Sequence, residues 1–195
     1  MALAEIIQVR KPLILSIAAG IQEASIQHWL GGKIAIVRAM PNTPALIGCG
    51  AAALHANAYV SHEQRNMAES ILRSTGITIW LSDESLMDAV TALSGSGPAY
   101  FFLMMEALQQ AAENQGLPTE TARLLTLQTA LGAARMAIES GKPLDELRQQ
   151  VTSKGGTTEK AISILEENHI RAIYQQALDA AKKRAEELGE LLGKI

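Results

Sequence analysis

Short apolar runs alternate with amphipathic segments in the first part of the chain. The run at residues 12–17 is continuous, as expected for a strand that is covered on both faces. The other strand candidates are residues 33–38 and 77–81, with a weaker extended segment at residues 51–60. Helical spacing occupies residues 21–30 and 61–74, and the second of these segments begins with a serine cap. This alternation predicts a layered α/β domain over residues 1–82.

The rest of the chain has the apolar spacing of helices, without a strand pattern. Residues 83–93 place Leu86, Val90 and Leu93 on one side of a helix, which the segment 94–98 interrupts. Pro98 is well placed as the first residue of the next helix, which is apolar nearly all round. We therefore predict an all-α helical domain over residues 83–195, so that the fold class is a partial Rossmann-like α/β domain followed by a helical domain.

A helix that is apolar nearly all round needs cover in so small a bundle. A second copy of the chain is the simplest source of that cover, so the pattern predicts a symmetric homodimer through residues 83–195. A self-sufficient monomeric bundle is the alternative.

Composition excludes several classes of protein. Hydrophobic residues make up 48% of the 195 residues and charged residues 19%, which is typical of a globular protein. The net charge of −3 and the lack of a basic face argue against nucleic acid as a main partner. No apolar run is long enough to cross a membrane. Cys49 is the single cysteine, so no disulfide framework is expected and the cytoplasm is the predicted location.

Motifs for metal binding and for a complete dinucleotide site find no support. The four histidines are scattered without the spacing of metal ligands, so no metal site is expected. Residues 48–53 formally fit the pattern G-x-G-x-x-A, but Asn42-Thr43-Pro44 precedes them and a strand-like segment follows. The chain therefore reads as the later part of a nucleotide-binding fold.

The glycine-rich segment 151–159 is the strongest candidate for a binding site. It places Gly155, Gly156, Thr157 and Thr158 immediately before an amphipathic run. A loop of this kind presents free backbone N–H groups at a helix N-terminus, which favours a small anion such as a carboxylate. The threonine hydroxyls could bind the ligand or cap the helix, and an ordinary helix cap is the alternative interpretation.

Four motifs occur in an order that resembles one enzyme family. They are Ser16-Ile17-Ala18-Ala19-Gly20, Arg38-Ala39-Met40-Pro41-Asn42-Thr43-Pro44, Ser94-Gly95-Ser96-Gly97-Pro98-Ala99-Tyr100 and Ser153-Lys154-Gly155-Gly156-Thr157-Thr158. Together they closely resemble pyrroline-5-carboxylate reductase over essentially the whole chain. The resemblance implies reduction of 1-pyrroline-5-carboxylate to L-proline with NADPH or NADH. It also implies a Rossmann domain, a helical domain that interlocks in a homodimer, and dimers that often assemble into rings.

Carried over position by position, the resemblance implies two sets of site residues. The cofactor-binding set is Ala18, Ala19, Gly20, Asn42, Thr43 and Gln150. The substrate-binding set is Glu84, Ser153, Gly155, Gly156, Thr157 and Thr158. Backbone N–H groups of the glycine loop would hold the substrate carboxylate, and the hydroxyl of Thr158, the catalytic assignment, would contact the ring nitrogen.

The chain also departs from the family pattern. In the family, a glycine-rich phosphate loop precedes everything present here, so the resemblance implies a truncated chain that binds NADPH weakly or not at all by itself. A non-catalytic helical dimerisation module is therefore the alternative function. A related reductase of hydroxy acids is disfavoured, because such enzymes use a catalytic lysine on a helix whereas Lys154 lies in the glycine loop.

Overall fold

The computed structural model describes residues 2–193, which form two compact units. The first unit combines Met1–Pro98 with Gln176–Ile195, and the second is Ala99–Gln175. The predicted division into domains between residues 82 and 83 stays a prediction. The compact first unit also includes residues 83–98 and the C-terminal segment from Gln176 onward.

A mixed four-stranded sheet forms the centre of the first unit. Its strands are β1 (Ile14–Ser16), β2 (Ile36–Met40), β3 (Gly50–Ala56) and β4 (Gly76–Trp80), in the order β1-β2-β3-β4. Strand β2 pairs parallel with β1 and antiparallel with β3, and β3 pairs parallel with β4. The expected strands are all present, and the weakly predicted extended segment is the longest of them.

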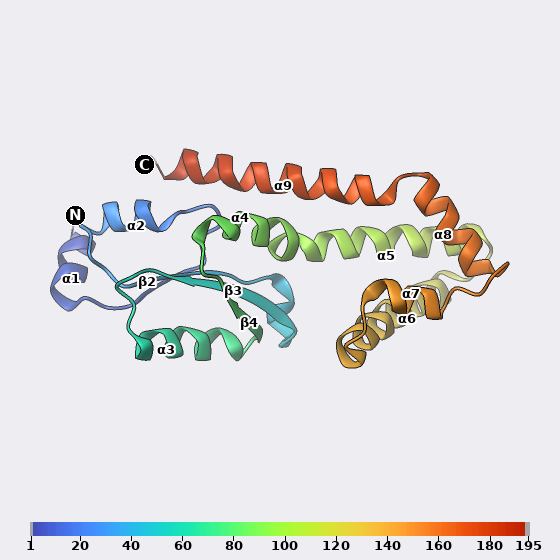
Figure 1. Ribbon diagram of the computed structural model, residues 1–195, viewed down its shortest axis with the longest axis horizontal. Coiled ribbons are helices and arrows are strands. Elements are labelled where there is room, and N and C mark those ends of the chain that lie inside the picture. The colour runs from blue at the N-terminus through green and yellow to red at the C-terminus, as the bar shows by residue number, and fades with distance from the viewer. Residues whose placement is uncertain (1, 194–195) are drawn as a thin grey trace. The chain divides into compact units, whose positions relative to one another are not determined.

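Helices cover both faces of this sheet. Helix α3 (His62–Arg73) packs on one face, where Val37, Ala39 and Leu54 meet Ala68 and Leu72 (Figure 1). Helices α1 (Ala2–Arg10) and α2 (Glu23–Trp29) pack through a separate cluster of buried isoleucines, which includes Ile36 of β2. Neighbouring residues of β2 thus join different clusters, as the twofold alternation of a strand requires. The α/β fold class predicted from the sequence is confirmed.

Strand β4 leads into three short helical turns instead of the single helix that was predicted at residues 83–93. A 3₁₀ turn η2 (Glu84–Leu86) is followed by α4 (Met87–Val90) and by the π-helical turn η3 (Thr91–Gly95). Met87 fixes this segment on the sheet, because it is buried against Met40 and Ala53.

The second unit contains only helices among its described residues, as predicted. The helices that supply it are α5 (Gly97–Asn114), α6 (Thr119–Ser140), α7 (Leu144–Gln150), α8 (Thr157–Glu167) and α9 (Ile170–Leu192). Helix α9 continues into the first unit from Gln176 onward. Pro98 is the second residue of α5, whereas the sequence predicts it as the first. It still lies in the first turn, where its missing N–H costs no helical hydrogen bond.

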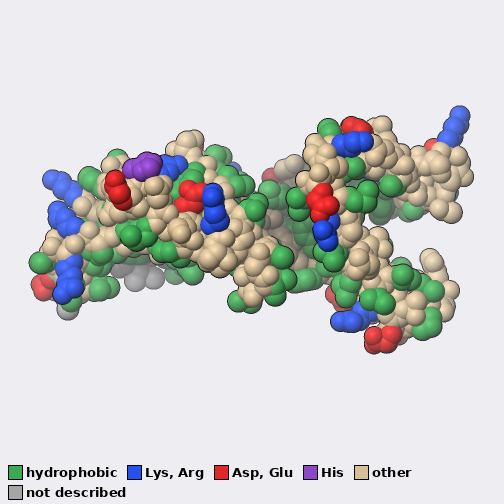
Figure 2. Space-filling model, turned by 90° about the horizontal axis from the view of Figure 1, so that it is seen from below, with side chains coloured by type: hydrophobic (Ala, Val, Ile, Leu, Met, Phe, Trp, Pro, Cys, Tyr) green, Lys and Arg blue, Asp and Glu red, His purple; other side chains and the backbone are tan. Residues whose placement is uncertain are grey.

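Many large apolar side chains of the helical unit are uncovered in a single chain. Phe101 and Phe102 of α5 are each 63% exposed, and Ile138 of α6 is 82% exposed. On the face seen in Figure 2, hydrophobic side chains reach the surface, and acidic and basic side chains occur in small mixed groups. Exposure on this scale marks a surface for association. Within residues 2–193, no helix is both long and apolar enough to span a membrane.

Candidate functional site

A hollow of about 500 Å³ opens in the first unit beside the end of strand β2. Three segments form its wall: the turn after β1, the residues that lead from β2 into the 3₁₀ helix η1 (Thr43–Ile47), and the π-helical turn. The lining residues are Ala19, Met40, Pro41, Asn42, Thr43, Ala45, Leu46, Thr91, Gly95 and Ser96. We call this hollow the β2 pocket. Three of the residues expected to bind cofactor, Ala19, Asn42 and Thr43, line it.

Asn42 holds the wall of the β2 pocket together. Its side-chain oxygen accepts a hydrogen bond from the backbone N–H of Ala51 at 2.9 Å, and its side-chain nitrogen donates to Oγ of Ser94 at 3.2 Å. One side chain thus joins the end of β2, the start of β3 and the π-helical turn. Because an amide carries two N–H donors, one donor is left for a ligand.

The π-helical turn was not recognised in the sequence. The carbonyl oxygen of Thr91 accepts a hydrogen bond of 2.9 Å from the N–H of Ser96, five residues later in the chain. The hydroxyl of Thr91 donates to the carbonyl of Met87 at 2.8 Å. A side chain at Gly95 would lie 3.2 Å from the sulfur of Met40, so the turn packs closely on β2. Such turns occur frequently at functional sites. From the sequence, the Ser-Gly-Ser-Gly segment is interpreted as a helix break and as part of a family motif, whereas its small residues also permit this close packing.

Glu84 and Gly20 lie in the first unit but outside the lining of the β2 pocket. The Oε1 atom of Glu84 accepts a hydrogen bond from Arg38 Nη1 at 2.6 Å and another from the backbone N–H of Glu23 at 2.6 Å. Arg38 is only 4% exposed, so Glu84 neutralises a buried cation. Asp88 belongs to the same charged neighbourhood, and partial burial raises the pKa of its carboxyl above the ordinary value although Arg38 acts in the opposite direction.

The glycine loop lies in the second unit between α7 and α8. Gly155 has φ of +71°, a conformation that side-chain-bearing residues rarely adopt, and its N–H donates to Oε2 of Glu159 at 2.6 Å. Gly156 is the N-cap residue of α8, and a β-carbon there would lie 2.5 Å from Oγ of Ser153. Both glycines are therefore required by the shape of the loop.

The first turn of α8 offers donors to a ligand. The first N–H groups of any α-helix have no intrahelical acceptor, and the N-cap residue of α8 makes no side-chain cap hydrogen bond. Thr157 is exposed and Thr158 is half-buried. The expected N–H donors differ in part from those observed, because Gly155 donates to Glu159 and Gly156 donates to the carbonyl of Ser153 at 3.0 Å. The N–H groups that face a ligand are therefore those of the first turn of α8. Gln150 ends α7 and donates to Glu146 at 3.0 Å along its own helix.

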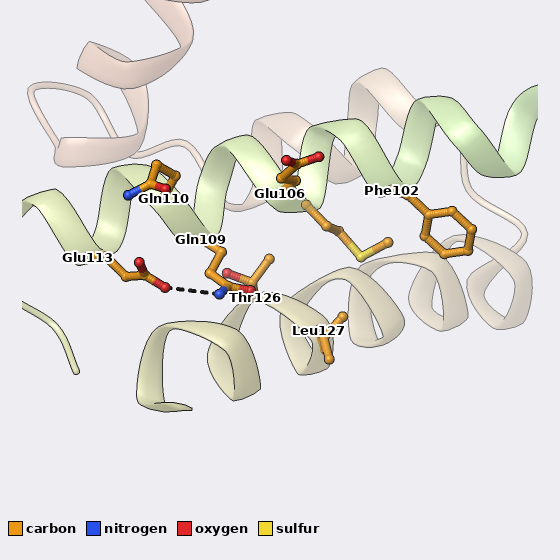
Figure 3. A pocket seen from close by; sticks show the side chains of 8 residues that line it. Phe102, Glu106, Gln109, Gln110, Glu113, Thr126 and Leu127 are labelled. Atoms are coloured by element: carbon orange, nitrogen blue, oxygen red, sulfur yellow. Dashed lines mark hydrogen bonds between the residues drawn. The ribbon is translucent and has the colours of Figure 1, made fainter. Parts of the chain in front are cut away.

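A smaller hollow of about 270 Å³ lies between α5 and α6 in the second unit. Figure 3 shows Gln109 and Glu113 of α5 joined by a hydrogen bond of 2.9 Å, with Thr126 and Leu127 on α6 below them. None of the expected site residues lies there. Among the described residues, no group of three His, Cys, Asp or Glu side chains is placed to hold a metal ion.

The sheet with helices on both faces, the pocket at the end of β2 and the added helical unit define a Rossmann-like protein with a helical domain. A family model described as pyrroline-5-carboxylate reductase dimerisation matches residues 84–188. The pyrroline-5-carboxylate reductase of Pseudomonas aeruginosa is 56% identical over 181 residues, which cover 93% of this chain and 66% of that protein. The enzyme of Pisum sativum is 42% identical over 176 residues, covering 90% and 64%.

Solved structures agree with these relatives. The structure of a pyrroline-5-carboxylate reductase from Coxiella burnetii has a TM-score of 0.91 and 53% identity, over 96% of this chain and 69% of that one. A pyrroline carboxylate reductase from Plasmodium falciparum, solved with NADP bound, has a TM-score of 0.86 and 32% identity, over 93% and 72%. The chain belongs to the pyrroline-5-carboxylate reductase family, as the four motifs predicted. It spans 66% of the length of the Pseudomonas relative.

Proposed function

We propose that this chain acts in the reduction of 1-pyrroline-5-carboxylate to L-proline with NADPH or NADH. The observation that carries the proposal is the glycine loop, where Gly155 and Gly156 set a turn that presents the N-terminal N–H groups of α8. These donors suit the substrate carboxylate. Membership of the family suggests what the rest of the substrate is, namely a five-membered cyclic imine.

The β2 pocket fits the nicotinamide end of the proposed cofactor. Its lining is mostly Ala, Met, Pro, Leu and Gly, with a few hydroxyl and amide groups, which suits a flat ring with one polar substituent. Ala18, Ala19, Gly20, Asn42 and Thr43 are the proposed residues at this end, and Gln150 is a further proposed cofactor contact. The reduced nicotinamide supplies the hydride.

The chemistry asks the protein mainly to bind and orient. The protonated imine accepts a hydride at its ring carbon, the C=N double bond becomes a single bond, and the nitrogen keeps its proton to give the amine of proline. In this proposal, the N–H groups of the first turn of α8 hold the carboxylate, Ser153 supports the loop, and Thr158 orients the ring nitrogen through its hydroxyl. The resemblance places Glu84 near the substrate, but no direct contact is proposed, because its carboxylate already accepts hydrogen bonds from Arg38 and from the N–H of Glu23.

Association with a second copy completes the proposal. The apolar faces of α5 and α6 and the match of residues 84–188 to a dimerisation family support a homodimer through the helical unit. Rings of dimers in the cytoplasm are part of the same proposal, carried by the resemblance.

An assay of NADPH oxidation that depends on pyrroline-5-carboxylate, with L-proline identified as product, tests this function. Thr158→Ala should lower kcat/KM by roughly 10- to 100-fold, the cost of one hydrogen bond to a charged group. Thr158→Ser keeps the hydroxyl and should retain most activity, and Ser163→Ala on the same helix should match the unmodified chain. A chain that forms dimers but reduces no imine would instead support a non-catalytic dimerisation module.

A further inference from the structure

The turn Ala18–Gly20 connects β1 to α2 and brings Ala19 into the wall of the β2 pocket. Within this turn the N–H of Ala18 makes a long hydrogen bond of 3.4 Å to Oγ of Ser16. Gly20 is buried and has φ of +74°, so the turn has an unusual backbone shape. Contacts from outside the turn must therefore help to fix its position.

The first of these contacts comes from Glu84. Its Oε1 atom binds the N–H of Glu23, the first residue of α2, and at the same time Nη1 of Arg38 on β2. Arg38 lies opposite Ser16, the last residue of β1, in the sheet register. One carboxylate oxygen thus connects α2, which follows the turn, to β2, which pairs with β1. Both hydrogen bonds are charge-assisted, which makes them stronger than neutral ones.

The second contact comes from the C-terminal part of α9, whose backbone lies directly against Gly20. A β-carbon at Gly189 would stand 2.4 Å from the carbonyl oxygen of Gly20. A β-carbon at Gly20 would stand 2.9 Å from both the carbonyl oxygen of Ala185 and the nitrogen of Gly189. All of these obstacles are backbone atoms, so the contact allows only glycine at both positions. Figure 1 shows this end of α9 beside α2.

We propose that Glu84 and Gly189 are positioning residues that hold the Ala18–Gly20 turn in the wall of the β2 pocket. The inference rests on the proposed function in one respect, since the ligand expected at that wall is the nicotinamide end of NADPH. Neither residue lines the pocket, so both act on the ligand through Ala19. This role differs from a direct contact of Glu84 with the substrate.

Hydrogen exchange of the full chain tests the proposal without any assay of activity. In Glu84→Ala and in Gly189→Ala, the amides of residues 17–24 should exchange faster than in the unmodified chain, because one contact of the turn is lost in each. Residues 50–56 of β3 should keep their protection in Gly189→Ala, which separates a local effect from global unfolding. Glu190→Ala, an exposed neighbour on the same helix, is the matched control. Unchanged exchange at residues 17–24 in both variants would overturn the proposal.

Steady-state kinetics supply the second measurement. Glu84→Gln keeps the length of the side chain and an acceptor for the Glu23 N–H. Glu84→Gln and Gly189→Ala, each as a single variant, should raise KM for NADPH by about 5- to 10-fold, as expected for a weakened turn. KM for pyrroline-5-carboxylate should stay within about 2-fold, because neither residue belongs to the glycine loop. A rise confined to the KM of the imine would make Glu84 a substrate contact and contradict its positioning role. If the unmodified chain reduces no imine, the proposed function fails, while the exchange measurement still decides whether these residues hold the turn.

Discussion

At the scale of the residue, the shape of the glycine loop depends on Gly156 more than on any hydroxyl. The space that a β-carbon would need is occupied by Oγ of Ser153 at 2.5 Å and by the carbonyl oxygen of Ser153 at 3.0 Å. The hydroxyl can rotate away, whereas the carbonyl is part of the turn. The loop therefore tolerates a change at Ser153 better than a change at Gly156.

Gly156→Ala should raise KM for pyrroline-5-carboxylate by roughly 10-fold or more, in line with an overpacking cost of about 1–3 kcal/mol. Its kcat should change less, because the distortion affects the groups that bind the carboxylate. The double variant Ser153→Ala with Gly156→Ala should recover part of the loss, since the nearer obstacle is gone. Initial rates over a range of imine concentrations measure both effects, and equal defects in the single and double variants would contradict this account.

At the scale of the element, the π-helical turn η3 and strand β2 are held together by polar groups as well as by packing. Asn42 donates a hydrogen bond to Ser94 at the wall of the β2 pocket, and Met87 is buried against Met40 and Ala53. The sheet, the turn and the pocket wall are thus one connected structure, and small changes in η3 should reach the pocket.

Ser94→Ala should cost about 1 kcal/mol of unfolding free energy, because it removes the partner of the Asn42 amide. It should also raise KM for NADPH, since Asn42 lines the proposed nicotinamide site. Denaturant unfolding and steady-state kinetics measure the two effects. Ser82→Ala, at an exposed residue between β4 and η2, serves as the control and should change neither quantity.

Asp88 on α4 should make stability depend on pH. Partial burial raises its pKa in the folded chain, while Arg38 and Lys182 act to lower it and Glu84 and Glu186 to raise it. The folded state then binds its proton more tightly than the unfolded state, so Asp88 costs stability as pH rises from about 4 through the raised pKa. Asp88→Asn removes this titration. Thermal unfolding between acidic and neutral pH should show a smaller loss of Tm with rising pH in the variant, and parallel curves would contradict the assignment.

At the scale of the whole molecule, the two units differ in how they bury their apolar side chains. The first buries its core between helices and a sheet, whereas the second leaves Phe101, Leu124 and Ile138 exposed in a single chain. Exposed apolar area of this kind is the usual mark of an interface, and it supports assembly through the helical unit.

Phe101→Glu should shift the protein from dimer toward monomer. Burying a phenylalanine contributes about 1.5–3 kcal/mol, twofold symmetry repeats the change, and a buried carboxylate adds a further cost. Sedimentation equilibrium over a range of concentrations measures the change in Kd. Met67→Glu, at an apolar side chain of α3 that is 58% exposed, is the control and should leave the dimer intact. Dimers of unchanged Kd in Phe101→Glu would place the interface elsewhere.

The sequence predicted the strands and the helical second part because hydrophobic periodicity is a local signal. It also predicted the glycine loop, whose residues are contiguous. It did not predict the π-helical turn, which depends on close packing of Gly95 against Met40 on another element. The hydrogen bond between Asn42 and Ser94 spans 52 residues, and the bonds of Glu84 reach back to α2 and β2, so no local pattern could indicate them.

The contact between Gly20 and Gly189 has a consequence for biosynthesis. The ribosome synthesises residues 2–98 well before residue 189. Until residue 189 is made, the turn between β1 and α2 lacks its contact with α9. The whole helical unit is synthesised in the meantime. The docking of the end of α9 against Gly20 is therefore the step that completes the first unit.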